Sequence, residues 1–169
     1  MHIYNPDIYP NLLTDIPLSA RDLVSQIKDY KLSFSKIHNR EVEWGMKLPM
    51  FVDVFYKMLL NNNKIPSQTE FVDEYLKTSL SYINVQTEAT RNELSLGISA
   101  RAKRTYPSLV RDIIFNKYAQ EKLINYNVKY NIELDVKEGI DMLLEDVHHN
   151  YYAICLFTNT SRAYIGRSK

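Results

Sequence analysis

The spacing of apolar residues changes near Asn125, and this change restricts the chain to a fold of the α+β class. Ahead of Asn125, apolar residues recur at steps of three and four, which is the period of a helix that buries one face. Beyond it, Val128 to Asp135 alternates apolar and polar residues, which is typical of a half-buried strand. The sequence therefore predicts a helical N-terminal two-thirds followed by a C-terminal antiparallel β-meander.

Helix boundaries are indicated by residues that can pair with the free backbone groups at helix ends. Ser19 begins a capping pattern, and Ser67 forms a capping box with Glu70. The run Asn61-Asn62-Asn63 is expected to end a helix that follows Pro49, because Asn tolerates the left-handed conformation. The expected helices lie at about 19–30, 49–60 and 67–76, and the last two form a helical hairpin, either a DNA reader or simply core.

Other stretches are less regular. Lys31 to Glu43 follows neither the helical nor the strand period. Pro107 lies inside a helical pattern, and because proline has no amide donor, we expect two helices here, at 87–104 and about 108–123. The expected strands are 128–135, 140–145, 151–158 and 162–167, with the third strand at the centre of the sheet.

Charge is distributed unevenly along the chain, whose net charge is +1. Residues 89–122 contain 7 Lys and Arg against 3 Asp and Glu, whereas residues 1–88 contain 9 against 11. The basic stretch is either a surface for a phosphate backbone or an ordinary solvated helix face. We expect a helical N-terminal domain over 1–88 and a second domain over 89–169, made of the basic helix and the meander.

Composition excludes several classes of protein. Apolar residues make up 45% of the chain and charged residues 24%, as in an ordinary globular domain. The longest apolar runs fall far short of the ~20 residues that span a bilayer. The single cysteine, Cys155, excludes an internal disulfide and a cysteine-built zinc site. We expect a cytoplasmic protein without membrane contact.

Acidic residues on or beside the predicted sheet are candidates for a metal site. Glu133 and Asp135 are two residues apart in a predicted strand, so their side chains would leave the same face. Asp141 begins the neighbouring strand, and Glu121 closes the preceding helix. Clustered carboxylates can hold a divalent cation that activates water against a phosphodiester. The alternative is that these are ordinary turn and edge acids.

Three segments follow one another in the last third of the chain: the basic helix 101–112, the run 139–144 with Asp141, and the apolar run 152–157. Their order resembles the core of the PD-(D/E)XK, or restriction-endonuclease-like, nuclease superfamily over about residues 100–169. The resemblance implies that Asp141 is a metal ligand, with Asp135 or Glu121 as its partner and Mg²⁺ or Mn²⁺ as the cofactor. The acid-x-Lys motif of that superfamily falls at 160–162, where this chain has Thr160 and Arg162.

The resemblance thus implies a metal-dependent DNA endonuclease-like protein that is degenerate or truncated, with a degenerate third-strand motif. Its catalytic residues would be Asp141, Glu121 and Arg162, and Arg162 would neutralise the developing phosphate charge. The expected contacts with the DNA backbone come from four basic residues: Arg101, Lys103, Arg104 and Arg111.

Two alternatives remain open. The strings Tyr152-Ala153-Ile154 and Tyr164-Ile165-Gly166 are similar to the paired strand signature of GIY-YIG nucleases, without that family's later Arg and Glu. The other alternative is a small non-enzymatic phage or mobile-element protein that binds a larger nucleic-acid-processing protein and inhibits or recruits it. Its contact surface would be the Tyr-rich sheet or the hairpin at 49–76.

Overall fold

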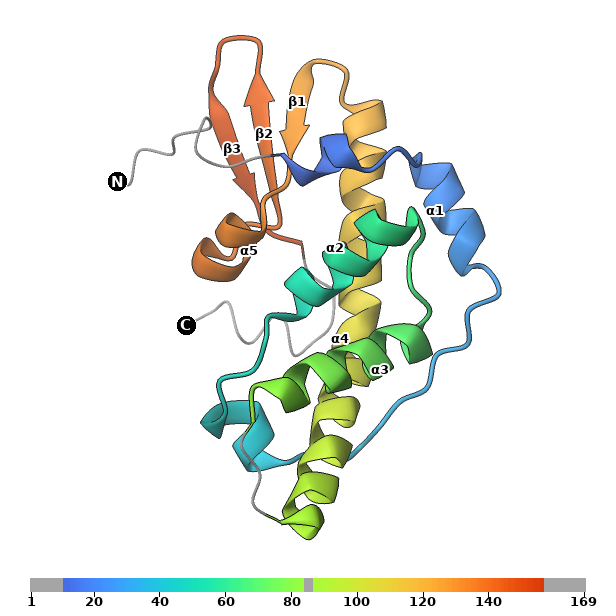
Figure 1. Ribbon diagram of the computed structural model, residues 1–169. Coiled ribbons are helices and arrows are strands. Elements are labelled where there is room, and N and C mark those ends of the chain that lie inside the picture. The colour runs from blue at the N-terminus through green and yellow to red at the C-terminus, as the bar shows by residue number, and fades with distance from the viewer. Residues whose placement is uncertain (1–10, 84–86, 157–169) are drawn as a thin grey trace. The chain divides into compact units, whose positions relative to one another are not determined.

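The computed structural model describes residues 11–83 and 87–156, and the chain divides into two compact units (Figure 1). The helical unit, residues 16–115, contains α1 (Ala20–Ile27), the π-helical turn η2 (Glu41–Gly45), α2 (Phe51–Asn62), α3 (Gln68–Ser81) and most of α4 (Glu88–Lys122). Of the described residues, the sheet unit takes 11–15 and 116–156, with η1 (Leu12–Asp15), the end of α4, β1 (Tyr126–Lys129), α5 (Ile132–Glu138), β2 (Met142–Asp146) and β3 (Tyr151–Ile154).

The predicted α+β class, with helices first and the meander last, is confirmed. The boundary expected at residue 88 coincides with the beginning of α4, whereas the compact units divide inside that helix.

Three helix boundaries in the helical unit have the predicted capping residues. Ser19 Oγ accepts from the Asp22 amide at 3.1 Å, and Ser67 Oγ accepts from the Glu70 amide at 3.3 Å. Both acids return a hydrogen bond to the cap residue, which completes a capping box and lowers the pKa of each carboxyl group. α2 ends at Asn62 and is capped by Asn63, whose φ of 46° lies in the left-handed region.

The predicted interruption at Pro107 is wrong, because α4 continues unbroken from Glu88 to Lys122. Pro107 has no amide, so the carbonyl of Lys103, four residues earlier, loses its helical partner. Gln68 at the start of α3 replaces that partner, with its Nε2 donating to Lys103 O at 3.0 Å. The Gln68 side chain is 3% exposed, so this bond is made away from water.

Aromatic rings fill the core between α2, α3 and α4. Phe71 lies 5.9 Å from Phe55 and 5.8 Å from Tyr106, measured between ring centroids, and Phe51 stacks on Tyr75 at 4.3 Å. The buried hydroxyls of Tyr75 and Tyr106 donate to the carbonyls of Pro49 and Pro66, so neither is left without a partner. The hairpin formed by α2 and α3 therefore buries its inner face against α4.

Among the described residues, the sheet unit contains three antiparallel strands in the order β1-β2-β3, with Val128 opposite Leu144 and Leu144 opposite Tyr152. Of these three strands β2 is the central one, whereas the sequence predicted that the third strand is central. The apolar run from Tyr151 had indicated burial, but it is β2 that supplies buried side chains, at Met142 and Leu143. The fourth predicted strand, at 162–167, lies outside the described residues.

The strand predicted over 128–135 ends at Lys129, and its second half is the helix α5. Asn131 caps this helix, because its Oδ1 accepts from the amides of Glu133 at 2.8 Å and Leu134 at 3.3 Å. Gly139 ends it with a φ of +68°, a conformation that glycine adopts without strain. Capping at both ends therefore outweighs the alternating pattern.

The link between Gln68 and Pro107 can be tested by a double-mutant cycle. Gln68→Leu should reduce the free energy of unfolding by about 2 kcal/mol, because partly buried groups on Lys103 and Ser33 lose their partner. In a Pro107→Ala background, which restores the missing amide, the same change should cost about 1 kcal/mol less. Urea denaturation followed by far-UV circular dichroism measures both costs.

The matched control is Gln26→Leu, which removes the acceptor of the Ile65 amide at 2.9 Å. Its cost should be the same with and without Pro107. If the costs of Gln68→Leu and Pro107→Ala are simply additive, the Lys103 carbonyl is not the link between them.

Candidate functional site

Two of the predicted acids, Asp135 and Asp141, interact electrostatically, although they do not lie on adjacent strands. Asp135 lies on α5 and accepts from the Tyr130 hydroxyl at 2.7 Å. Asp141 precedes β2, and its Oδ2 accepts from the Leu156 amide. Burial raises the pKa of Asp135, and the negative charge of Asp141 raises it further against the Tyr130 hydrogen bond. The two carboxyl groups therefore share one electrostatic environment.

The other predicted catalytic and metal residues do not join this pair. Glu133, which the strand prediction placed beside Asp135, is exposed on α5 and pairs with Lys137 at 2.9 Å. Glu121 is exposed on α4 and interacts electrostatically with Lys117. Arg162 lies outside the described residues.

The number of carboxylates limits which metal ions Asp135 and Asp141 can bind. Among the described residues, no three His, Cys, Asp or Glu side chains gather closely enough to hold a metal ion. One or two carboxylates together with water and a substrate phosphate suffice for Mg²⁺, however, because this ion keeps several of its waters. In the described part of the chain, Asp135 and Asp141 therefore form no closed protein cage for a metal ion.

Two of the predicted DNA-binding residues make contacts inside the helical unit. Arg101 Nη1 donates to Val42 O at 2.8 Å, and Arg104 Nη1 donates to Ile37 O at 2.5 Å. Both guanidinium groups also pair with the carboxylate of Glu43. These two arginines therefore hold the segment around residues 37–43 against α4.

The other two predicted DNA-binding residues, Lys103 and Arg111, do not take part in these contacts with residues 37–43. Lys103 presents its main-chain carbonyl to Gln68. Arg111 pairs with Asp112, with its Nε 2.6 Å from Asp112 Oδ1. The four predicted DNA-binding residues thus have different contacts. Arg101 and Arg104 bind residues 37–43, and Arg111 forms a local ion pair.

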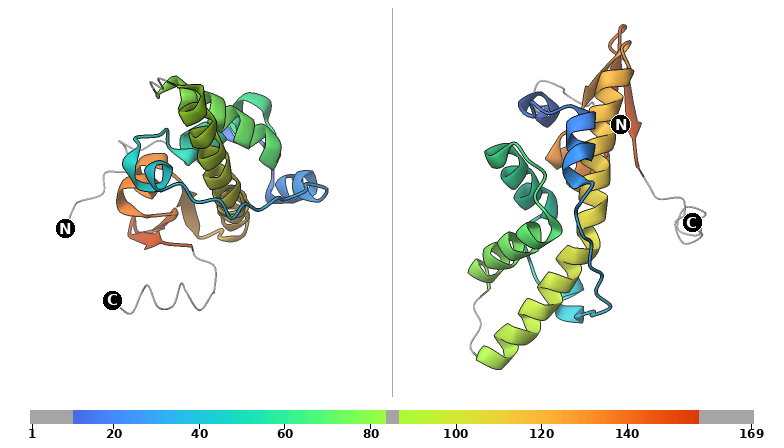
Figure 2. Two further views of the ribbon diagram at one scale, coloured as in Figure 1. Left: turned by 90° about the horizontal axis from the view of Figure 1, so that it is seen from below. Right: turned by 90° about the vertical axis from the view of Figure 1, so that its right-hand side faces the viewer.

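Residues 31–47, here called the strap, run beside α4 as an irregular chain that ends in η2 (Figures 1 and 2). Three side chains fix the strap, because Gln68 binds Ser33 and the two arginines bind residues further along. The approach is close at Gly97, where a Cβ atom would lie 2.7 Å from the Cβ of Asn39. A glycine at this position of α4 therefore lets the strap pack directly on the helix.

The strap exposes large apolar side chains although its backbone is anchored. Trp44 is 87% exposed and Phe34 is 76% exposed, and Leu32 and Ile37 are each nearly half exposed. In contrast, Val42 is fully buried beside the anchors. The concentration of four exposed large apolar residues on one short segment makes the strap a candidate interaction surface.

Sequence reasoning missed this surface because the strap follows no period. The available signal was the only tryptophan of the chain, at Trp44, directly before Gly45 and directly after the stretch 31–43, which follows neither the helical nor the strand period. A tryptophan in such a stretch is not explained by a helical or strand core.

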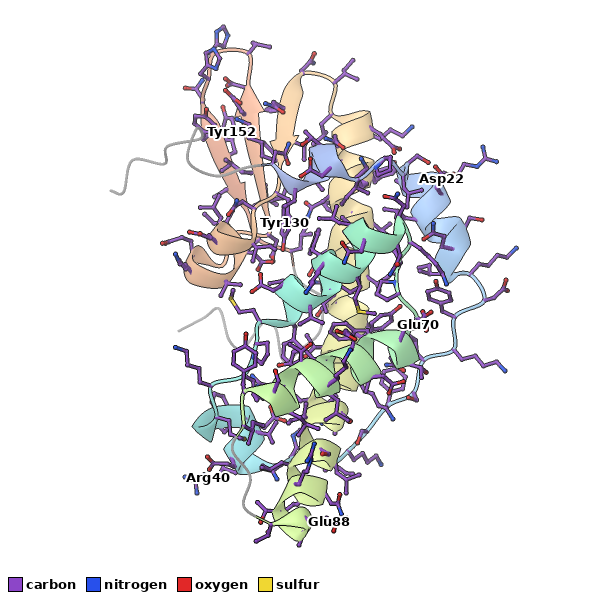
Figure 3. All side chains as sticks on the ribbon, viewed as in Figure 1. Asp22, Arg40, Glu70, Glu88, Tyr130 and Tyr152 are labelled. Carbon is purple, nitrogen blue, oxygen red and sulfur yellow. The ribbon has the colours of Figure 1, made fainter. Side chains whose placement is uncertain are left out.

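The sheet unit contains a polar cluster centred on Glu145. Its carboxylate lies 2.7 Å from Lys129 Nζ and from His149 Nδ1, and it accepts from the Tyr151 hydroxyl at 3.0 Å. The hydrogen bonds from Lys129 and His149 lower the pKa of Glu145 to about 2. This cluster is satisfied by its own members. On the opposite face, Tyr152, labelled in Figure 3, reaches Asp146 through its hydroxyl at 3.2 Å.

Comparison with known proteins gives no relative: no protein-family model, no curated protein and no solved structure matches this chain. Over residues 11–83 and 87–156, no helix is long and apolar enough to cross a membrane. The functional conclusion therefore depends on the geometry of the chain itself.

The close packing of the strap predicts the effect of enlarging Gly97. Gly97→Ala should displace the strap from α4, because the added methyl group would overlap Asn39, and overpacking of this kind costs about 1–3 kcal/mol. The displaced strap should be cleaved faster by trypsin after Lys31, Lys36 and Arg40, as followed by mass spectrometry. Leu96→Ala, at the exposed neighbouring position, is the control and should leave cleavage unchanged. Equal rates for wild type and Gly97→Ala would contradict the proposed anchoring.

Proposed function

We propose that the protein is a non-enzymatic binding module that docks a partner protein through the strap. The observation that carries this proposal is the 87% exposure of Trp44 on a segment held in place by side chains of α3 and α4. Tryptophan is among the residues that contribute most to protein–protein binding energy, because its large ring fills a pocket of the partner. Leaving it in water has no benefit for the isolated fold.

The anchoring of the strap supports the same function. A flexible segment loses conformational entropy when it binds, at a cost of about 0.5–1.5 kcal/mol for each immobilised side chain. Here the main-chain carbonyls of Ser33, Ile37 and Val42 already accept hydrogen bonds from Gln68, Arg104 and Arg101. The strap therefore presents its apolar side chains in one arrangement before any partner arrives. This mode of action suits a small factor that inhibits or recruits a larger nucleic-acid-processing protein.

The proposal is tested by selecting ligands from a random-peptide display library on the folded, immobilised protein. Peptides enriched on the wild type should lose at least about tenfold in affinity, ~1.4 kcal/mol, for a Phe34→Ala/Trp44→Ala variant. The matched control is Leu96→Ala/Tyr82→Ala, which removes two exposed apolar side chains of the same unit outside the strap. Enriched peptides that bind the strap variant as well as the wild type would place the docking surface elsewhere.

A second candidate function is favoured by one observation, the electrostatic coupling of Asp135 and Asp141. A carboxylate pair of this kind can bind Mg²⁺ or Mn²⁺ together with a phosphate, so we also propose metal-dependent cleavage of DNA as the competing activity. In that activity, Asp141 and Asp135 bind the cation, which supplies the charge that activates water.

Cleavage of supercoiled plasmid and of single-stranded DNA, with Mg²⁺ or Mn²⁺, separates the two candidates. Nuclease activity should disappear in Asp141→Asn, which keeps an acceptor for the Leu156 amide and so preserves the local fold. Glu133→Gln, at an exposed acid of the same unit, is the control and should cleave normally. Absence of cleavage by folded wild-type protein would reject the nuclease and leave the binding module.

A further inference from the structure

We infer that the strap recognises an acidic amphipathic protein segment, with carboxylates meeting its lysines and apolar side chains meeting Phe34 and Trp44. This inference rests on the proposed docking function and adds the chemistry of the partner. The evidence comes from the charges, the apolar side chains and the cavity of the strap, which are taken in turn.

The outward charge of the strap is positive. It carries four exposed cations, none of which makes a hydrogen bond or ion pair with any residue in the described part of the chain: Lys31, Lys36, Arg40 and Lys47. Figure 3 shows Arg40 projecting from the strap. The strap has two acids, and the charge of Glu43 is already met by Arg101 and Arg104. Only Glu41 is left to oppose the four cations, so an acidic partner is the electrostatic complement.

The apolar side chains decide which class of acidic partner fits. Single-stranded nucleic acid is also acidic, and its bases stack on aromatic rings such as Phe34 and Trp44. Leu32 and Ile37, however, have no aromatic ring for a base to stack on, yet both are exposed between the lysines. A protein segment that interleaves acids with large apolar residues would cover all of these side chains. A second copy of the strap carries the same cations and would be repelled.

A cavity that is open to solvent lies beside Trp44. It has a volume of about 750 Å³, and its mostly polar lining includes Trp44, His38 and Arg40 together with the acids Glu41 and Glu93. The lining contains both signs of charge, so the net attraction for acids comes from the lysines along the rest of the strap.

Trp44 also provides the measurement, because it is the only tryptophan in the chain and lies at the proposed contact. Its fluorescence is followed while the full-length protein is titrated with a synthetic peptide of Glu, Leu and Phe in amphipathic helical spacing. The comparison ligands are the same peptide with Lys in place of every Glu, a polyglutamate of equal length, and oligothymidylate. The acidic amphipathic peptide should shift the emission to the blue and bind at least about tenfold more tightly than each of the others, ~1.4 kcal/mol.

Charge reversal on the strap gives the matched test. Lys31→Glu/Lys36→Glu should abolish binding of the acidic peptide and favour its lysine counterpart. Lys57→Glu/Lys77→Glu makes the same change in net charge on α2 and α3, and should leave the preference unchanged. Circular dichroism of both variants confirms that each is folded.

The results separate the failure of this inference from the failure of the proposed function. If library selection gives strap-dependent peptides that are not acidic, or if oligothymidylate binds more tightly than the acidic peptide, the partner class is wrong and the strap remains a docking surface. If no selected peptide depends on Phe34 and Trp44, the proposed function and this inference both fail.

Discussion

The buried side chain of Gln68 joins three segments of the helical unit, and the candidate surface depends on this junction. Its Nε2 donates to the carbonyl of Lys103, which Pro107 leaves without a helical partner, and to Ser33 O, while its Oε1 accepts from the Ser33 amide. α4 can therefore pass through a proline without breaking. With α4 continuous, Arg101 and Arg104 lie three residues apart on one side of the helix and both reach Glu43. The exposed tryptophan is held by this chain of contacts.

The parts of the fold that could be predicted are those whose partners are close in sequence. The capping boxes at Ser19 and Ser67 close over three residues, and a reader of the sequence can see both members. The continuity of α4 depends on a partner 35 residues away, so Pro107 was read as a break. Asn131 is a helix cap that lies close to its partners in sequence, yet it was missed. The residues that follow it alternate between apolar and polar, and this pattern fits a strand as well as a short capped helix.

The same distinction applies to the candidate site. The sequence pointed to Asp135 and Asp141 as a pair, but it placed Asp135 on a strand, whereas this residue lies on the short helix α5 and interacts with Asp141 only electrostatically. The strap could not be anticipated, because irregular backbone has no period. Its anchors join residues 59 and 67 positions apart, at Arg101 with Val42 and Arg104 with Ile37. Two arginines of the basic stretch of α4 therefore contact the strap, and the sequence gives no sign that the strap lies beside this helix.

The exposure of Trp44 has a practical consequence for the bench. Its indole is in water in the native state and would be in water in the unfolded state, so tryptophan emission should change little when the chain denatures. A flat fluorescence melt could then be recorded from a cooperatively folding protein, and a native spectrum could be mistaken for that of an unfolded one. The rings that do sense unfolding are buried tyrosines such as Tyr75 and Tyr106. Near-UV circular dichroism in the tyrosine region therefore monitors folding, whereas tryptophan fluorescence can be used to detect binding near Trp44.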